Sequence, residues 1–205
     1  MKYFDKIFVV SLPNEVGWER MEVMQPHLEE EGLPFTVWVG TALDNGVMGL
    51  LASMHGLLTY CIMHNYSNVL ILEDDNRFLV PIVPAMDEIW PQVPKHYHCL
   101  FLSCNLLTRP ERVSKNILRI RSSYSTNAIV YSLEAMKLII PLIEANPTTA
   151  YDITLMKGLQ QTYGKCYCTY PMLSNQRAGY SSIEKKDIDW AAYQAQSFAM
   201  HTHNI

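Results

Sequence analysis

Short apolar runs alternate with longer segments of helical periodicity through the first half of the chain. Residues 6–12, 34–39 and 69–72 are short, mostly apolar and rich in β-branched side chains, which is typical of buried strands. Residues 18–31 and 47–64 carry apolar side chains at the three- and four-residue spacing of a helix. This alternation predicts an α/β domain with a mainly parallel, Rossmann-like sheet flanked by helices.

The second half of the chain has a more mixed pattern. Strands are expected at residues 97–103, 117–121, 128–131 and 165–170, and helices at residues 85–90, 133–144, 151–161 and 187–199. The strands at 117–121 and 128–131 are expected to form a hairpin-like pair around residues 122–127. We therefore expect a single domain over residues 1–205, in which a smaller mixed part follows the parallel sheet.

Composition narrows the classes of protein to consider. Of the 205 residues, 49% are hydrophobic and 18% are charged, and the formal net charge is −4. Such a chain can bury a sizeable core, but it lacks the basic excess of a general nucleic-acid binder, so no nucleic-acid partner is expected.

The N-terminus does not resemble a signal peptide, and no uninterrupted apolar run of about 18 residues predicts a transmembrane segment. We expect a cytoplasmic protein that could still associate peripherally with a membrane.

The five cysteines do not form a recognisable metal-binding pattern. Cys166 and Cys168 share one face of a strand-like run. No second pair of cysteines or histidines lies at the spacing of a zinc finger. Reduced, partly buried thiols are therefore favoured over a zinc site, as in a reducing compartment.

Three acidic residues, Glu73, Asp74 and Asp75, directly follow the apolar strand at residues 69–72. In open α/β sheets, ligands bind outside the carboxyl ends of the strands. If the chain stays extended, Glu73 and Asp75 point to one side and form a half-site for Mg²⁺ or Mn²⁺, which substrate phosphates and water would complete. The alternative is a solvated strand end, and the pattern alone leaves both interpretations open.

Several segments, taken in order, resemble a known family. They are residues 7–13 followed by Arg20 and Met21, residues 49–55 (GLLASMH), residues 70–76 (LILEDDN), residues 125–140 with Asp152 downstream, and residues 171–183 with Gln176 and Ser181-Ser182-Ile183. Together they resemble glycosyltransferase family 25, the lipopolysaccharide-biosynthesis and procollagen-galactosyltransferase group. The likeness departs from the family pattern where Met54 separates Ser53 from His55, and where a single Arg20 replaces a tandem arginine.

The resemblance implies a GT-A fold and a metal-dependent glycosyltransferase. Such an enzyme would move a hexose, with galactose as one candidate, from a UDP-sugar to a glycan or other hydroxyl acceptor, and would invert the anomeric configuration. Mn²⁺ or Mg²⁺ would bind at Glu73 and Asp75, with His203 as a further ligand from the His-rich end of the chain. A loose tail is the competing interpretation of His203.

The remaining site residues follow from the same resemblance. The turn after the first strand, with Leu12 and Pro13, is expected to bind the donor together with Arg20 and Asp74. Arg20 would reach a phosphate or the ribose. Asp152 would be the base that removes the proton of the acceptor hydroxyl. A helix N-cap is the alternative role for Asp152.

Two other functions compete with a sugar transferase. The first is a non-catalytic nucleotide- or carbohydrate-binding domain of the same fold, against which intact Glu73, Asp75 and Asp152 argue. The second is a nucleotidyltransferase, which also combines acids and a metal on an α/β sheet. It would usually have a glycine-rich phosphate loop near the N-terminus, and residues 12–17 (LPNEVG) contain no such glycine cluster.

Overall fold

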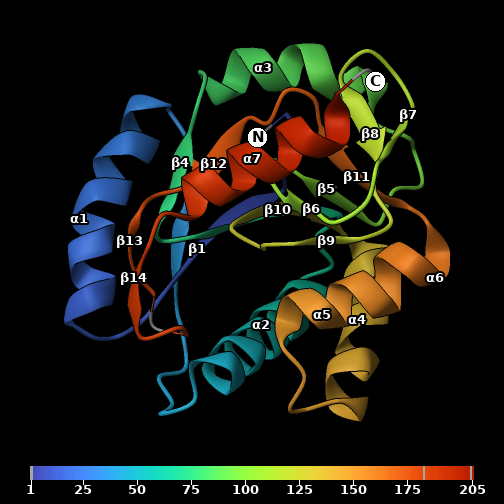
Figure 1. Ribbon diagram of the computed structural model, residues 1–205. Helices are drawn as coiled ribbons and strands as arrows, with labels where there is room; N and C mark the ends of the chain where they lie inside the picture. Colours follow the sequence, from blue (N-terminus) through green and yellow to red (C-terminus); the bar gives the residue numbers. More distant parts are fainter. Residues whose placement is uncertain (1, 182, 204) are drawn as a thin grey trace.

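An eight-stranded sheet runs through the middle of the protein, between two layers of helices (Figure 1). The computed structural model describes residues 2–181, 183–203 and 205. Across the sheet, the strands lie in the order β2 (Thr36–Val39), β1 (Lys6–Ser11), β3 (Asn68–Glu73), β10 (Ala128–Ser132), β5 (Cys99–Phe101), β11 (Cys166–Thr169), β8 (Ile117–Arg119) and β7 (Glu111–Arg112).

Most strands of the sheet run in one direction. β1 pairs in parallel with β2 and β3, and β5 pairs in parallel with β11. β10 and β8 run in the opposite direction to the other six of these eight strands. The prediction of a mainly parallel sheet with a mixed second half is thus confirmed. The predicted hairpin of residues 117–121 and 128–131 is wrong, because β5 and β11 lie between β8 and β10.

Helices cover both faces of the sheet, since its strands are apolar on both sides. Phe8 and Val10 of β1 point into a core with α2 (Gly46–Met63), α4 (Leu133–Ala145) and α5 (Tyr151–Leu155). Ile7 and Val9 point into a second core with α1 (Glu15–Glu30) and α3 (Ile82–Ile89). The short 3₁₀ turn Trp90–Gln92 follows α3, the π-helical turn Met156–Gln160 and α6 (Gln161–Tyr163) follow α5, and α7 (Trp190–Thr202) lies along β6 and β12.

Three short strand pairs lie outside the central sheet, and none of them has a clear pattern in the sequence. They are β4 (Asn76–Phe78) with β12 (Ser174–Gln176), β6 (Asn105–Leu106) with β9 (Ser123–Tyr124), and β13 (Gly179–Ser181) with β14 (Lys186–Ile188). Each has two or three residues per strand, too few to show a period of two. They matter because they carry the polar loops at one edge of the sheet.

Helix α2 has the length and apolarity of a membrane span. It has 18 residues and a mean hydropathy of 1.5. However, Leu51, Met54 and Leu58 are buried in the core, and the helix packs against α4. Its apolar character therefore serves the interior of this fold.

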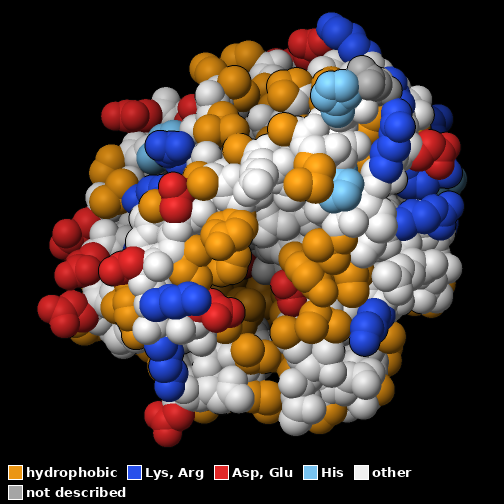
Figure 2. Space-filling view, in the orientation of Figure 1, with side chains coloured by type: hydrophobic (Ala, Val, Ile, Leu, Met, Phe, Trp, Pro, Cys, Tyr) orange, Lys and Arg blue, Asp and Glu red, His pale blue; other side chains and the backbone are white. Residues whose placement is uncertain are grey.

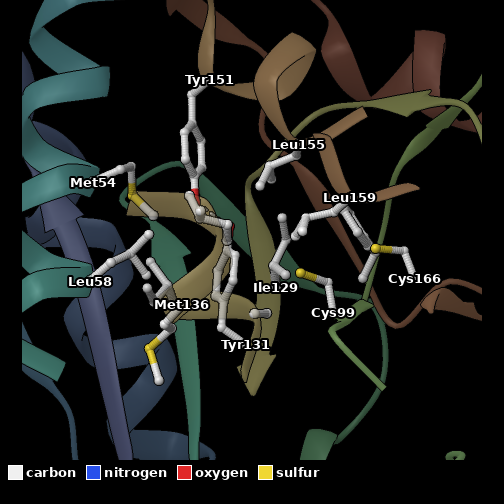
Figure 3. Packing of buried hydrophobic residues seen from close by; sticks show 14 of the residues in the cluster. Met54, Leu58, Cys99, Ile129, Tyr131, Met136, Tyr151, Leu155, Leu159 and Cys166 are labelled. Atoms are coloured by element: carbon white, nitrogen blue, oxygen red, sulfur yellow. Dashed lines mark hydrogen bonds between the residues drawn. The ribbon is translucent and has the colours of Figure 1, made fainter. Parts of the chain in front are cut away.

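A pair of buried tyrosines fastens α5 to the sheet. Figure 3 shows Tyr151 of α5 reaching toward Tyr131 of β10, and its hydroxyl donates to the Tyr131 hydroxyl over 3.2 Å. Both side chains are 1% exposed, and Leu155 and Ile129 pack in the same cluster. This anchoring fixes the position of the neighbouring residue, Asp152.

All five cysteines are free and buried. Burial raises the pKa of the Cys61 thiol to about 12. The thiols thus act as small apolar side chains in the core, as the sequence suggested.

Candidate active site

The three acidic residues lie at a turn between two strands. β3 ends at Glu73, Asp74 and Asp75 form the turn, and β4 begins at Asn76. The expected extended geometry, with Glu73 and Asp75 on one side and Asp74 on the other, is therefore wrong. The turn brings Asp74 and Asp75 to the same cation, Arg20.

Arg20 of α1 links the acidic turn to the chain near the C-terminus. Its Nη1 lies 2.8 Å from Asp74 Oδ1 and 3.2 Å from Asp75 Oδ2, and its Nη2 donates to the carbonyl oxygen of Tyr180 over 2.5 Å. Burial opposes the charge of Arg20, but the carboxylates of Asp75 and Asp74 outweigh it and raise the Arg20 pKa. Arg177 Nη2 donates to the carbonyl oxygens of Asp74 and Arg20. Arg20 therefore serves here as the counter-ion of the acidic turn.

The start of α1 packs tightly against the end of β1, which brings Ser11 to the acidic turn. A Cβ on Gly17 would lie 2.0 Å from the Leu12 carbonyl oxygen, so only glycine permits this approach. Ser11 Oγ contacts the Gly17 carbonyl oxygen at 3.2 Å and donates to Asp74 Oδ2 over 2.8 Å. Asn14 accepts from the Gly17 amide and caps the helix.

Glu73 and Asp75 each have a polar partner from a distant segment. Thr126 Oγ1 donates to Glu73 Oε1 over 2.7 Å, and Gln176 Nε2 donates to Asp75 Oδ2 over 2.9 Å. Among the described residues, none bonds to the buried Asp75 Oδ1. Asp75 thus keeps one carboxylate oxygen for another ligand.

Burial makes this cluster electrostatically costly. Burial, with the neighbouring charge of Asp75, raises the pKa of Glu73 to about 8. Burial also raises the pKa of Asp75, although Arg20 opposes that shift. Buried like charges favour protonation unless a cation offsets them. Arg20 pairs with Asp74 and Asp75, and its charge opposes the rise of the Glu73 pKa only weakly.

We expect Glu73→Gln to stabilise the ligand-free protein at pH 8. Folding raises the Glu73 pKa from 4.5 to about 8, so between these values the folded chain holds a proton that the unfolded chain releases. The free energy of unfolding should then fall as pH rises from about 5 to 8. In Glu73→Gln this fall should shrink, as urea denaturation at pH 5 and pH 8 would measure. Glu22→Gln, an exposed change on α1, is the control, and an identical pH dependence in both variants would contradict the expectation.

The acidic turn meets one requirement of a divalent-metal site. The free Oδ1 of Asp75 is an oxygen ligand of the kind that Mg²⁺ and Mn²⁺ prefer. Among the described residues, however, no group of three or more His, Cys, Asp or Glu side chains could hold a metal. A metal at the acidic turn would therefore need further ligands from the substrate, in the way that substrate phosphates often complete the coordination of Mg²⁺.

His203 does not join the acidic turn. It follows the last residue of α7, whereas Trp190 at the first residue lines the site. A helix of 13 residues spans about 20 Å. The structure therefore does not bring His203 to the predicted metal site, and because α7 continues to Thr202, the segment before His203 is not the loose tail of the alternative either.

A first cavity of about 200 Å³ opens over the acidic turn. Its walls come from the end of β1, the start of α2 and the β13–β14 hairpin. Leu12, Arg20 and Asp74, which were predicted to bind the donor, line it together with Glu73 and Asp75. Pro13 does not: it is exposed and lies outside the lining, because the chain turns there toward the cap of α1.

A second cavity of about 440 Å³ adjoins the first. Glu73, Gln176 and Trp190 line both cavities, so the two spaces meet at the acidic turn. Asp152 lines the second cavity. Figure 2 shows a hollow at the centre of this face, between α7 above and α2 and α5 below, with apolar side chains on its rims.

Asp152 lies in the first turn of α5, but it is not the N-cap. That position belongs to Ala150, which makes no side-chain capping bond, so the N-cap alternative is wrong. The Asp152 carboxylate accepts from the amide of Ile153 over 2.8 Å, and the backbone of Ser125 also favours its ionised form. Burial raises the Asp152 pKa despite these bonds. A carboxylate with a raised pKa in a cavity is suited to accept a proton.

Other residues of the site had weak signals in the sequence. Thr126 lies in the segment 125–140 of the family resemblance but was not predicted as a site residue, and Trp190 belongs to a segment with no motif. Glu184, expected to be solvated, is exposed but lines the second cavity. His55 instead pairs with Glu144 over 3.2 Å and lines neither cavity. Ser182, part of the late segment of the family resemblance, lies outside the described residues.

Solved structures identify the fold of this protein. One is a glycosyltransferase involved in the glycosylation of the major capsid of PBCV-1, with a TM-score of 0.55 and 13% identity over 88% of this chain and 96% of that chain. Another is A197 from STIV, with a TM-score of 0.54 and 9% identity over 89% of this chain and 91% of that chain. No protein-family model matches the chain, and no curated protein matches its sequence significantly. The protein has the GT-A-like fold of glycosyltransferases.

Proposed function

We propose that this protein transfers a hexose from a UDP-sugar to a hydroxyl group of a glycan or other acceptor, with inversion and with the help of Mn²⁺ or Mg²⁺. The observation that carries the proposal is the pair of cavities that meet at the acidic turn. One has the acidic turn and Arg20 on its wall, and the other holds Asp152. The choice of uridine, the membership of family 25 and a cytoplasmic location rest on the sequence resemblance and composition.

The first cavity suits a nucleotide sugar. Leu12, Leu43 and Leu50 give it an apolar wall, and Arg20 gives it a cation. Asp75 would hold the metal through its free oxygen, with Glu73 close to the same ligand set. A bound divalent cation would neutralise the charge that develops on a departing diphosphate. Arg20 and Ser11 keep Asp74 and Asp75 in a fixed position before any ligand arrives.

The second cavity suits the acceptor. Asp152 is the proposed base, which takes the proton of the acceptor hydroxyl as that oxygen attacks the anomeric carbon. Tyr151 fixes the start of α5 through its bond to Tyr131, and the amide of Ile153 orients the Asp152 carboxylate. If the acceptor oxygen attacks the anomeric carbon from the second cavity while UDP leaves toward the first, the two groups would be in line, which is the geometry of inversion.

Thermal shift with a nucleotide panel tests the class of ligand. UDP, GDP, CMP and ATP would each be added with and without Mn²⁺. We expect UDP to raise the Tm only when the metal is present, because Asp75 and the diphosphate each supply part of one coordination shell. A donor-hydrolysis screen over UDP-sugars would then name the sugar without an acceptor. UDP stabilisation without hydrolysis of any UDP-sugar would favour a non-catalytic binding domain, and stabilisation by ATP alone would favour a nucleotidyltransferase.

A further inference from the structure

We infer that Gln194 of α7 is a positioning residue that fixes the donor and acceptor sides of the site relative to each other. This inference rests on the proposed function, because it assigns Gln194 a role in that reaction. Gln194 lines neither cavity and contacts none of the carboxylates. It acts through the residues that do.

Gln194 is a fully buried amide whose bonds reach two separate segments. Its exposed fraction is 0%. Its Oε1 accepts from the backbone amide of Gln176 over 3.0 Å. Its Nε2 donates to Ser125 Oγ over 3.0 Å and to Asn127 Oδ1 over 3.1 Å. One side chain therefore joins β12 to the loop of residues 122–127.

On the donor side, the link runs through Gln176. The backbone of Gln176 is held by Gln194, and its side chain donates to Asp75 Oδ2 over 2.9 Å. The next residue, Arg177, donates its amide to the Asp75 carbonyl oxygen over 2.8 Å. Gln194 thus determines where the chain meets the proposed metal-binding carboxylate.

On the acceptor side, the link runs through Ser125, whose backbone is strained. Its φ of 75° is a left-handed conformation that residues other than glycine adopt at a cost. Such a conformation persists only where the surroundings hold it. Ser125 Oγ donates to Asn127 Oδ1 over 2.9 Å and accepts from Gln194. Ser125 and Asp152 line the same second cavity, and the Ser125 backbone favours the ionised form of Asp152.

The same loop also carries the partner of Glu73. Thr126, next to Ser125, donates to Glu73 Oε1, and the Glu73 amide donates to the Asn127 carbonyl oxygen over 2.9 Å. Asn127 in turn donates through Nδ2 to Asn76 Oδ1 over 3.0 Å. Ser103 also joins this loop to β12, since its Oγ donates to Asn127 Oδ1 over 2.9 Å and accepts from Ser174 Oγ over 3.2 Å. Of these two side chains, only Gln194 bonds to Gln176 and Ser125, the residues nearest the two sides of the site.

Gln194→Met is the variant that tests this role. Methionine has a similar length and flexibility but no hydrogen-bonding amide. Phe198→Leu is the matched control. Phe198 lies one turn later on α7 and stacks on Tyr170, so its replacement should weaken the docking of α7 without changing a residue that lines the site. Gln196→Met, at an exposed position of the same helix, controls for the substitution itself.

The first measurement is hydrogen exchange, which does not depend on catalysis. In Gln194→Met, the amides of residues 122–127 should exchange roughly tenfold faster than in Phe198→Leu, because the strained loop loses its support. Equal exchange in the two variants would overturn the inference, whether or not the protein is a transferase.

The second measurement is donor hydrolysis. Gln194→Met should lower kcat by roughly 10- to 100-fold. The acid limb of its pH profile should move to higher pH, since a displaced Ser125 backbone would no longer lower the Asp152 pKa. Phe198→Leu should keep kcat within about twofold and leave the limb in place. The inference would be overturned if Gln194→Met and Phe198→Leu had the same kcat and the same acid limb in their pH profiles. A wild-type protein that hydrolyses no UDP-sugar overturns the proposed function instead.

Discussion

Asp75→Asn is expected to reduce sugar transfer and donor hydrolysis by about two to four orders of magnitude, in the range of a lost electrostatic or ligand contact in an active site. The amide keeps the shape of the side chain and can still contact Gln176, but it removes the negative charge that would bind the metal. Burial already makes the Asp75 carboxylate costly, so its replacement should leave the Tm nearly unchanged or raise it. Hydrolysis rates at saturating UDP-sugar, with thermal denaturation in parallel, would measure both effects.

Metal removal should reproduce the loss. We expect EDTA to abolish hydrolysis by the wild type, and added Mn²⁺ or Mg²⁺ to restore it, while the residual activity of Asp75→Asn should respond only weakly to the metal. Glu22→Gln, which changes an exposed carboxylate to an amide on α1, is the matched control and should behave as the wild type does. Full activity in EDTA would exclude a metal, and Arg20 would then be the cation left to face a diphosphate.

Asp152→Asn is expected to lower kcat by roughly 10²- to 10⁴-fold, the usual range for a general base. Donor binding should stay intact, because Asp152 lines the second cavity and not the first. Hydrolysis should fall as well as transfer, since water needs the same base. In the wild type, burial raises the Asp152 pKa. As the pH is lowered, the rate should therefore begin to fall at a pH above the ordinary pKa range of an aspartate. This acid limb should be absent from the residual activity of the variant.

The stereochemistry of the product provides an independent check. A one-step transfer from an α-linked UDP-sugar with Asp152 as base gives a β linkage, which the anomeric proton shows by NMR. An α linkage would mean retention, and the base role would have to be abandoned. Glu184→Gln is the companion variant, because Glu184 is an exposed acid of the same cavity. Wild-type kcat in Asp152→Asn, with a loss in Glu184→Gln, would transfer the base role to Glu184.

The elements that could be predicted from sequence are those with enough residues to show a period. β1, β3 and α2 were located to within about one residue, since each has a continuous apolar run or a helical pattern. The order of the strands was not available from the sequence. β8 and β10 are close along the chain, and the insertion of β5 and β11 between them depends on pairings over more than 30 residues.

The candidate site was predictable only where it is local. Glu73, Asp74 and Asp75 adjoin a recognisable strand, so their place at its carboxyl end followed directly. Their geometry did not follow, because a turn at Asp74 replaces the expected extension. Partners such as Thr126 and Gln194 were missed because a threonine or a glutamine has no special pattern. Their importance comes from contacts with residues 53 to 69 positions away.

The long spans of these contacts have a consequence for a chain still on the ribosome. Once β3 and its turn have emerged, the growing chain contains all three acids, and Arg20 and Ser11 are available to pair with Asp74. Gln176, which orients Asp75, comes 101 residues later, and Gln194 follows it by another 18. The N-terminal half can therefore begin its sheet early while the acidic turn lacks its final geometry. We expect a nascent or truncated chain that ends before β12 to form much of β1, β2 and β3 and yet to gain no stability from UDP with Mn²⁺.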